Sequence, residues 1–357
     1  MKIVYLSTQI SSSGGAAKVT ASKVNYFIEN WGYEVSIISS NDEIEKTFFE
    51  FNPQVKFYFL NHKMKNPFSI ISFYKQVNVL IKIINPDVIL VNDNGFKAYF
   101  ASLFIKKKNL WFEIHGSRIF LLQDKRSTIE NRLILGVSNL LYKKFDKIIL
   151  LNEESKTEWN HRDIAIIPNF VEPVSKIGIN KIHSNRIIAV GRISVEKGYD
   201  RMLTVFEKVV ADFPDWSLHI YGKIEDVGLY HSLLERKVPQ VFFYGETLSI
   251  EEKIIESEFL IHAAYHEGMG MVLVEALNLG KVVVAFDVPF VVNGIIKDSI
   301  NGFLAEDNNL LQFEEKMRLL IEDKELLSRM ETTTKKSIPT YQLEGVVGQW
   351  ERLFRSL

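Results

Sequence analysis

The 357-residue chain contains no cysteine, which excludes a disulfide framework, a thiolate metal site and a cysteine nucleophile. No window reaches the roughly 18 apolar residues that a transmembrane helix requires. The first apolar run, residues 1–7, is too short for a signal peptide and predicts a first strand instead. With 46% hydrophobic and 24% charged residues, the composition predicts a globular protein of two domains, which we expect in the cytoplasm.

Three functional patterns are also missing from the sequence. The first predicted strand is not followed by Gly-x-Gly-x-x-Gly, which disfavours a dehydrogenase. There is no Asp-x-Asp triad in a suitable context and no His-x-x-x-His pair, so we expect neither a metal ion nor another cofactor. Because no nucleic-acid module appears and the pI is near 6.7, we do not expect nucleic acid as a partner.

The net charge of −1 conceals an uneven distribution. Residues 1–170 carry 22 basic and 16 acidic side chains, and the rest of the chain carries 21 and 28. Residues 97–147 alone hold 11 basic and 4 acidic side chains, with aromatic residues between the lysines at 96–108 and 140–145. This pattern suits peripheral binding to an anionic membrane surface, such as the inner face of a plasma membrane. It is equally typical of solvated helix faces, and both interpretations stay open.

Apolar runs alternate with amphipathic stretches, which predicts right-handed βαβ units and mainly parallel sheets. The predicted strands are residues 2–7, 34–39, 55–60, 88–92, 110–114, 147–151, 165–167, 186–190, 216–221, 240–244, 259–263 and 282–285. The predicted helices are residues 16–30, 69–84, 128–144, 153–159, 199–211, 249–256, 272–279, 311–321 and 341–354. The alternation pauses after Pro168, where a polar stretch to Asn185 is typical of a linker.

The densest motif runs from His266 to Leu277 and joins a predicted strand to a predicted helix. Its turn contains Gly268, Met269 and Gly270, and backbone N–H groups at such a helix start favour an anion. Glu267 lies in the turn and Glu275 about two helical turns further on, so both carboxylates can face one crevice. A diphosphate with a hydroxyl-rich group on either side, as in a nucleotide sugar, fits this layout. The alternative is an acidic helix start without function.

A second motif, Gly191–Gly198, follows the predicted strand 186–190. Arg192 and Lys197 place two cations at the exit of this strand, where they can neutralise the charge that develops on a diphosphate leaving group. The alternative interpretation is an exposed arginine and lysine on an ordinary loop.

Glu-Gly-Met-Gly-Met-Val-Leu-Val-Glu-Ala, from Glu267 to Ala276, resembles the E-x7-E motif of retaining glycosyltransferases of family 4, the glycosyl transferases group 1, with Met269 in place of the common phenylalanine. Gly191–Gly198 resembles the family's Gly-Arg-Leu-x-x-x-Lys-Gly. The resemblance implies an α/β fold of glycosyltransferase-B architecture, with two Rossmann-like domains facing a central cleft. The implied parts are an acceptor-binding domain (1–168), a linker (169–185), a nucleotide-sugar domain (186–338) and a helix crossing back to the first domain (339–357).

The resemblance also implies roles for single residues. Glu267 would bind sugar hydroxyls, Glu275 the ribose, and Arg192 and Lys197 the diphosphate, while His115 after the strand 110–114 would contact the donor sugar near the reaction centre. Further implied or candidate substrate-binding positions are Gly14, Gly15, Tyr221, Gly222, Gly245, Gly268, Met269, Gly270, Met271 and Val272. Gly14 and Gly15 can instead form a plain turn, and His115 can be structural.

Five less specific positions complete the set. Asp93 and Asn94 end a predicted strand and can face an acceptor, and Arg118 can bind an acceptor phosphate. Pro168-Asn169 resembles the family's Pro-Asn-Gly at the domain junction, but Phe170 replaces the glycine, so we interpret this site as a hinge.

The resemblance implies transfer, with retention, of a hexose or N-acetylhexosamine from a nucleotide diphosphate sugar, with UDP as the expected nucleotide. We expect this transfer to need no metal, because Arg192 and Lys197 can neutralise the leaving group. The expected acceptor is a glycan, lipid-linked, in bacterial surface polysaccharide biosynthesis. Two alternatives remain at this point: a nucleotide-sugar epimerase of the same fold, which needs no acceptor, and a non-catalytic nucleotide-sugar-binding module.

Overall fold

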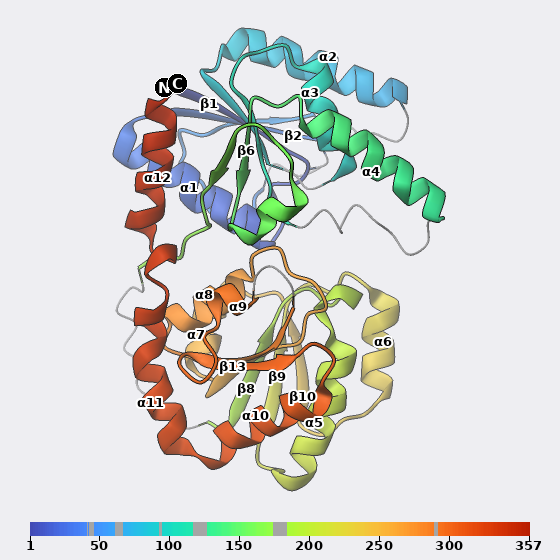
Figure 1. Cartoon of the computed structure of the whole chain (residues 1–357), viewed down its shortest axis with the longest axis vertical. Helices are drawn as coiled ribbons and strands as arrows, with labels where there is room; N and C mark the ends of the chain where they lie inside the picture. The colour runs from blue at the N-terminus through green and yellow to red at the C-terminus, as the bar shows by residue number, and fades with distance from the viewer. Residues whose placement is uncertain are drawn as a thin grey trace. The chain divides into compact units, whose positions relative to one another are not determined.

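A computed structural model describes residues 1–40, 42, 46–60, 67–92, 95–116, 127–173, 184–288 and 292–357 (Figure 1). The chain divides into two compact units. The first comprises Met1–Pro168 together with Val347–Leu357, and the second comprises Asn169–Val346. Each unit is built around one parallel sheet, as the alternating pattern of the sequence predicts.

The sheet of the first unit has seven parallel strands in the order β3-β2-β1-β4-β5-β6-β7. The strands are β1 (Lys2–Ser7), β2 (Glu34–Ser39), β3 (Lys56–Phe59), β4 (Val88–Asn92), β5 (Leu110–Glu113), β6 (Lys147–Leu150) and β7 (Ile164–Ile166). Most are nearly continuous apolar runs, because a parallel sheet is covered by helices on both faces. Strands β1 and β4 are neighbours, so the order of the sheet reverses between them.

One face of this sheet is covered by α2 (Pro67–Ile84), the 3-10 helix η1 (Phe96–Phe100), α3 (Ala101–Phe104) and α4 (Thr128–Tyr142). The helix α4 begins with a capping box, in which the Ser127 side chain accepts from the Glu130 amide and the Glu130 carboxylate accepts from the Ser127 amide. The helix predicted at 153–159 is instead the short 3-10 helix η3 (Glu154–Glu158), whose five residues form fewer than two turns.

The other face is covered by α1 (Gly15–Trp31) and by the end of α12 (Leu343–Arg355). The rings of Phe27, Trp350 and Phe354 pack together, with Phe27 and Phe354 5.4 Å apart between centroids. Phe354 also stacks on Trp111 of β5. The last eleven residues of the chain therefore complete the core of the first unit (Figure 1).

The sheet of the second unit has six parallel strands in the order β10-β9-β8-β11-β12-β13. The strands are β8 (Arg186–Val190), β9 (Ser217–Tyr221), β10 (Val241–Gly245), β11 (Phe259–His262), β12 (Val282–Asp287) and β13 (Gly302–Glu306). The helices are η4 (Val195–Lys197), α5 (Tyr199–Asp212), α6 (Val227–Glu235), α7 (Ile250–Ile255), α8 (Met271–Asn278), α9 (Val292–Ile295), α10 (Leu310–Glu322), α11 (Lys324–Thr334), η5 (Lys335–Ser337) and η6 (Pro339–Tyr341). Strand β13 and helices α6, α9 and α11 were not expected from the sequence.

Residues 169–173 pack within the second unit instead of forming a free linker. Phe170 and Val171 are buried, Val171 bridges Gln342, and the Glu172 carbonyl accepts from the Asn278 amide at 3.0 Å. Residues 174–183 of the expected linker lie outside the described residues. Among the described residues, no helix is both long and apolar enough to cross a bilayer.

Candidate active site

The two strongest motifs of the sequence lie where the order of strands in the second sheet reverses. From β8 the chain builds β9 and β10 on one side, and it then returns to place β11, β12 and β13 on the other. Strands β8 and β11 are therefore adjacent, and their carboxyl ends form the switch point at which open parallel sheets bind ligands. The loop Gly191–Gly198 follows β8, and residues 263–270 follow β11.

Glycines allow the loops at this edge to pack closely. Gly198 has φ +64°, and a Cβ there would lie 1.9 Å from the Ala263 carbonyl oxygen. Gly222 has φ +148°, and a Cβ there would lie 2.0 Å from the Gly191 carbonyl oxygen. Its amide donates to the Gly245 carbonyl at 2.8 Å. A side chain at Gly198 or Gly222 would therefore separate neighbouring strand ends.

Lys197, Glu267 and His262 form one cluster between the two loops. The Lys197 ammonium donates to Glu267 Oε1, and His262 Nε2 lies 3.0 Å from the same oxygen. Glu267 and His262 are buried, whereas the side chain of Lys197 is 18% exposed. Burial by itself raises the pKa of Glu267, but the adjacent Lys197 and His262 outweigh it and hold that pKa well below its usual range. The carboxylate is therefore charged at neutral pH.

Arg192, the other predicted cation, is held by two carboxylates. Its Nη1 donates to Glu225 Oε2 at 2.5 Å, and its Nη2 donates to Glu196 Oε1 at 3.0 Å. The Arg192 side chain is 45% exposed, so both ion pairs are in contact with water. The structure thus brings Arg192 and Lys197 to one edge of the sheet with a carboxylate beside each of them.

The helix α8 starts at Met271, and Gly270 before it has φ +64°. The amides of Leu273 and Val274 donate to the Gly270 carbonyl, which leaves the amides of Met271 and Val272 at the helix start. Met271, Val272 and Glu275 are only partly buried, in contrast to the buried residues between and after them. These three residues form one side of α8, where the sequence places substrate contacts.

Two predicted substrate contacts have a different environment in the structure. Met269 is buried, and its sulfur accepts from the Asn169 amide at 3.2 Å, so its side chain packs into the second unit. The ring of Tyr221 stacks on the ring of Tyr244 at 4.8 Å and is buried. Side chains project from the faces of a sheet, so the Tyr221 ring lies over a face of the sheet. The groups that remain at the ends of β9 and β10 are the backbone atoms of Tyr221, Gly222 and Gly245.

In the first unit, the glycine loop after β1 is held by a residue that the sequence did not single out. Gly14 precedes α1, and its carbonyl accepts from the Lys18 amide at 3.1 Å. The buried carboxylate of Asp42 accepts from the Ile10 amide at 2.8 Å and from the Ser39 hydroxyl at 2.6 Å. Asp42 therefore fixes the chain just before Gly14 and Gly15.

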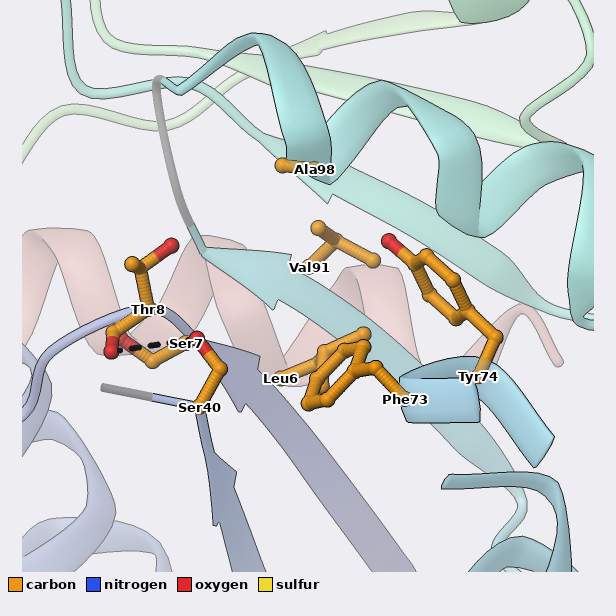
Figure 2. Close-up of a pocket in the computed structure, with 8 residues that line it drawn as sticks. All are labelled: Leu6, Ser7, Thr8, Ser40, Phe73, Tyr74, Val91 and Ala98. Carbon is orange, nitrogen blue, oxygen red and sulfur yellow. Dashed lines mark hydrogen bonds between the residues drawn. The ribbon is translucent and has the colours of Figure 1, made fainter. Parts of the chain in front are cut away.

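A small pocket lies at the carboxyl ends of β1 and β4, the switch point of the first sheet (Figure 2). It is lined by Leu6, Ser7, Thr8, Ser40, Phe73, Tyr74, Val91 and Ala98. Figure 2 shows the hydroxyls of Thr8 and Ser40 on one side and the rings of Phe73 and Tyr74 on the other. The Ser40 hydroxyl donates to the Thr8 carbonyl at 3.4 Å. The pocket thus combines a polar wall with an apolar one.

His115 follows β5, the neighbour of β4 in the same sheet. Its Nε2 lies 3.1 Å from Glu113 Oε1, and Glu113 in turn contacts Lys23 of α1. All three side chains are nearly inaccessible to water. The sequence had identified His115 but neither of its charged neighbours.

Only some of the remaining predicted positions lie within the described residues. Asp93, Asn94 and Arg118 lie outside the described residues. Pro168 and Asn169 stand at the boundary between the two units. Among the described residues, no group of three or more histidine, aspartate and glutamate side chains could hold a metal ion.

Comparisons with known proteins agree with this architecture. Residues 176–337 match the family model "Glycosyl transferases group 1", and residues 12–152 match "Glycosyl transferase 4-like". An uncharacterized glycosyltransferase of Haemophilus influenzae is 27% identical, over 98% of this chain and 99% of the relative. The amylovoran biosynthesis glycosyltransferase AmsD of Erwinia amylovora is 23% identical, over 98% of each chain.

Among solved structures, Anabaena HepE in complex with UDP and glucose superposes with a TM-score of 0.77 at 16% identity, over 100% of both chains. This similarity shows the fold. Together, the two family models match most of the sequence and both units. The second unit therefore resembles the glycosyl transferases group 1, and the chain is a glycosyltransferase with the two-domain glycosyltransferase-B fold.

Proposed function

We propose that this glycosyltransferase moves a hexose or N-acetylhexosamine from a UDP-sugar to a glycan acceptor with retention of the anomeric configuration. The observation that carries the proposal is that Arg192, Lys197 and Glu267 all lie in the loops at the switch point between β8 and β11. Two cations and a charged carboxylate at this edge can bind a diphosphate and the hydroxyl groups of a sugar.

The diphosphate binds to Arg192 and Lys197 in this proposal. In the free protein each cation has carboxylate partners, so the arriving diphosphate must take over those contacts. Arg192 can bind phosphate oxygens bidentately, and Lys197 acts as a point charge. The amides of Met271 and Val272 at the start of α8 supply further donors.

The two glutamates bind the two hydroxyl-rich parts of the donor. Glu275, on the partly exposed side of α8, binds the ribose. Glu267 is ionised and lies in the loop 263–270 after β11, where it accepts hydrogen bonds from the sugar hydroxyls. The backbone of Tyr221, Gly222 and Gly245 borders the nucleobase.

The reaction forms one bond and breaks one bond at the anomeric carbon. The acceptor oxygen bonds to this carbon on the face from which the diphosphate departs, and the bond to the β-phosphate oxygen breaks. A β-phosphate oxygen takes the acceptor proton, so the products are the glycoside and UDP. Arg192 and Lys197 stabilise the charge that develops on the leaving group, and His115 contacts the donor sugar.

The acceptor is a lipid-linked glycan in this proposal, and the outer surface of α2, α3 and α4 supports it. These adjacent helices carry eight exposed large apolar side chains: Phe68, Ile71, Val79, Ile83, Leu103, Ile129, Leu133 and Leu140. Residues 67–84, 95–109 and 127–144 contain nine lysines and arginines but a single carboxylate, Glu130. Exposed apolar side chains among cations favour an anionic lipid surface, as at the inner face of a plasma membrane.

Within this surface, Ile129, Leu133 and Leu140 occupy one side of α4 at helical spacing. Leu133→Glu should therefore reduce sedimentation with anionic vesicles at low salt. The matched control is Leu311→Glu, because Leu311 is similarly exposed on α10 of the second unit. Equal sedimentation with neutral and anionic vesicles would reject the lipid surface without affecting the donor site.

The names of two similar proteins support separate parts of the proposal. AmsD takes part in amylovoran biosynthesis, which supports a role in polysaccharide biosynthesis, and HepE forms a complex with UDP and glucose, which supports a UDP-sugar as the donor. The deciding experiment is a panel of radiolabelled nucleotide sugars, assayed with and without membrane lipid extract. Sugar transfer to the extract supports the proposal. Release of an epimerised nucleotide sugar without acceptor would identify an epimerase, and binding without turnover would identify a binding module.

A further inference from the structure

The first unit buries a complete ion pair that the proposed function does not use. Lys23 of α1 donates to Glu113 at the end of β5, and each side chain is 1% exposed. Burying two charges costs a desolvation penalty that their attraction often fails to repay, so such a pair is weak evidence for stability. Glu113 stands two residues before His115, and this position indicates another role for the pair.

We propose that Glu113 and Lys23 are positioning residues that hold the His115 imidazole for catalysis. This inference rests on the proposed function, because it assigns His115 to the donor sugar. It adds two residues from distant parts of the chain to the machinery of the first unit.

The geometry of β5 places Glu113 and His115 on the same side of the chain. Side chains alternate along extended backbone, and Phe112 and Ile114 contribute to the core under α2 and α4. Trp111 and Glu113 therefore face α1 and α12, where Trp111 stacks on Phe354. His115 continues this second row, and its Nε2 lies 3.1 Å from Glu113 Oε1.

Lys23 keeps the Glu113 carboxylate in place and in its charged form. The groups that face this carboxylate are the Lys23 ammonium from α1, the imidazole of His115 and the ring of Tyr5 from β1. Burial by itself raises the pKa of Glu113, but Lys23 and His115 lower it to about 2. Lys23 is itself fixed, because its ammonium lies 4.3 Å from the ring centroid of Trp350.

A charged carboxylate at this distance selects one state of the imidazole. The charged Glu113 Oε1 can only accept a hydrogen bond, so it favours the proton on the facing Nε2. In a neutral imidazole the other ring nitrogen, Nδ1, is then the acceptor. Glu113 therefore sets both the direction of the ring and the position of its proton.

The second unit contains a similar arrangement that differs in one decisive respect. His262, Glu267 and Lys197 also combine a histidine, a glutamate and a lysine at the end of a parallel strand. The Lys197 side chain is 18% exposed, whereas that of Lys23 is 1% exposed. Lys197 can exchange its partner for a ligand, but Lys23 cannot, so the first-unit pair acts through His115.

The test uses the full-length protein with three variants: Lys23→Met, Glu113→Gln and the double variant. Each single variant should lower kcat by about 10- to 100-fold, the scale for misplacing a reacting group, with KM for the donor within two-fold of wild type. Lys23→Met leaves a buried carboxylate without its cation, so the pKa of Glu113 rises. The loss of kcat should then shrink as pH increases and Glu113 ionises. Glu113→Gln should show no such pH dependence.

The double variant removes both charges and leaves no unpaired ion, so it should fold at least as well as either single variant. Its kcat should match that of Glu113→Gln, because Lys23 acts only through Glu113. The matched control is Lys147→Met, which breaks another lysine–carboxylate pair of the same unit (Lys147–Asp163, 2.6 Å) and should leave kcat unchanged. If His115→Ala lowers kcat but the double variant keeps the kcat of the wild type, His115 works without the pair and the proposal is overturned.

A measurement without turnover separates this inference from the proposed function. In protein labelled with ¹⁵N-histidine, the Nε2 proton of His115 should give a slowly exchanging, downfield signal that is lost in Glu113→Gln and retained in Lys147→Met. If the signal behaves in this way but His115→Ala is fully active, the positioning contact exists and the role of His115 is wrong. An unchanged signal in Glu113→Gln would overturn the positioning contact itself.

Discussion

Glu225→Gln should strengthen UDP binding, because it removes a carboxylate that competes with the diphosphate for Arg192. In the free protein Glu225 accepts from Arg192 Nη1 at 2.5 Å, and Glu196 accepts from Nη2 at 3.0 Å. UDP must displace at least one of these contacts before the guanidinium can bind its diphosphate bidentately. In Glu225→Gln the contact with Nη1 is no longer an ion pair, so UDP binds Arg192 without having to displace it.

The size of the effect follows from the exposure of the pair. The Arg192 side chain is 45% exposed and that of Glu225 is 48% exposed, so water screens their attraction. Pairs of this kind contribute about 0.2–1 kcal/mol. Losing that amount in the free state alone corresponds to a decrease in Kd for UDP of about 1.4- to 5-fold. The gain should decrease with added salt, because salt weakens the ion pair in the wild-type protein.

Isothermal titration with UDP measures this change directly. The matched control is Glu207→Gln, which removes another exposed glutamate–arginine pair of the same unit (Glu207–Arg236, 3.1 Å) and should leave Kd unchanged. In an Arg192→Ala background, Glu225→Gln should lose most of its effect. Weaker UDP binding by Glu225→Gln, or an equal gain in the Glu207→Gln control, would refute the competition between Glu225 and the diphosphate.

Three further predictions concern the donor site. Arg192→Ala and Lys197→Ala should each lower turnover by about 10²–10³, the scale for losing one stabiliser of a developing anion; steady-state kinetics with near-wild-type rates in both would show that the diphosphate lies elsewhere. Glu275→Gln should weaken UDP binding, whereas Glu267→Gln should not weaken it, because it also frees Lys197, and should lower turnover, because the sugar is no longer held in reacting geometry; titration and transfer assays giving the opposite pattern would invert our placement of the nucleotide. Transfer should continue in the presence of a chelator, because Arg192 and Lys197 neutralise the leaving group; complete loss that magnesium or manganese restores would contradict this.

Much of the fold could be predicted because parallel strands buried on both faces leave a clear apolar signal. Strands β1, β2, β4 and β8 begin and end where the sequence indicates. Strand β13 escaped prediction because its five residues begin at Gly302 and end at Glu306. The short helices α9 and η3 were missed or misassigned because one or two turns carry too little periodicity.

The candidate site could be predicted only in part, for a related reason. Local motifs identified Arg192, Lys197 and Glu267, because each stands in a distinctive loop after a strand. Their partners depend on how distant segments meet. Glu225 is 33 residues from Arg192, and Lys23 is 90 residues from Glu113. A single sequence contains no local signal for contacts of this kind, and the order of strands in the sheet creates them.

The helix α12 has a consequence for how the protein is made. The first unit draws part of its core, Trp350 and Phe354, from the last eleven residues of the chain. During synthesis the second unit can bury its own sheet while the aromatic rings of Phe27 and Trp111 still lack their contacts with α12. The unit that is translated first is thus completed last. Until α12 has been synthesised and packs against it, the exposed aromatic surface and the incompletely covered Lys23 make the nascent first unit prone to aggregation.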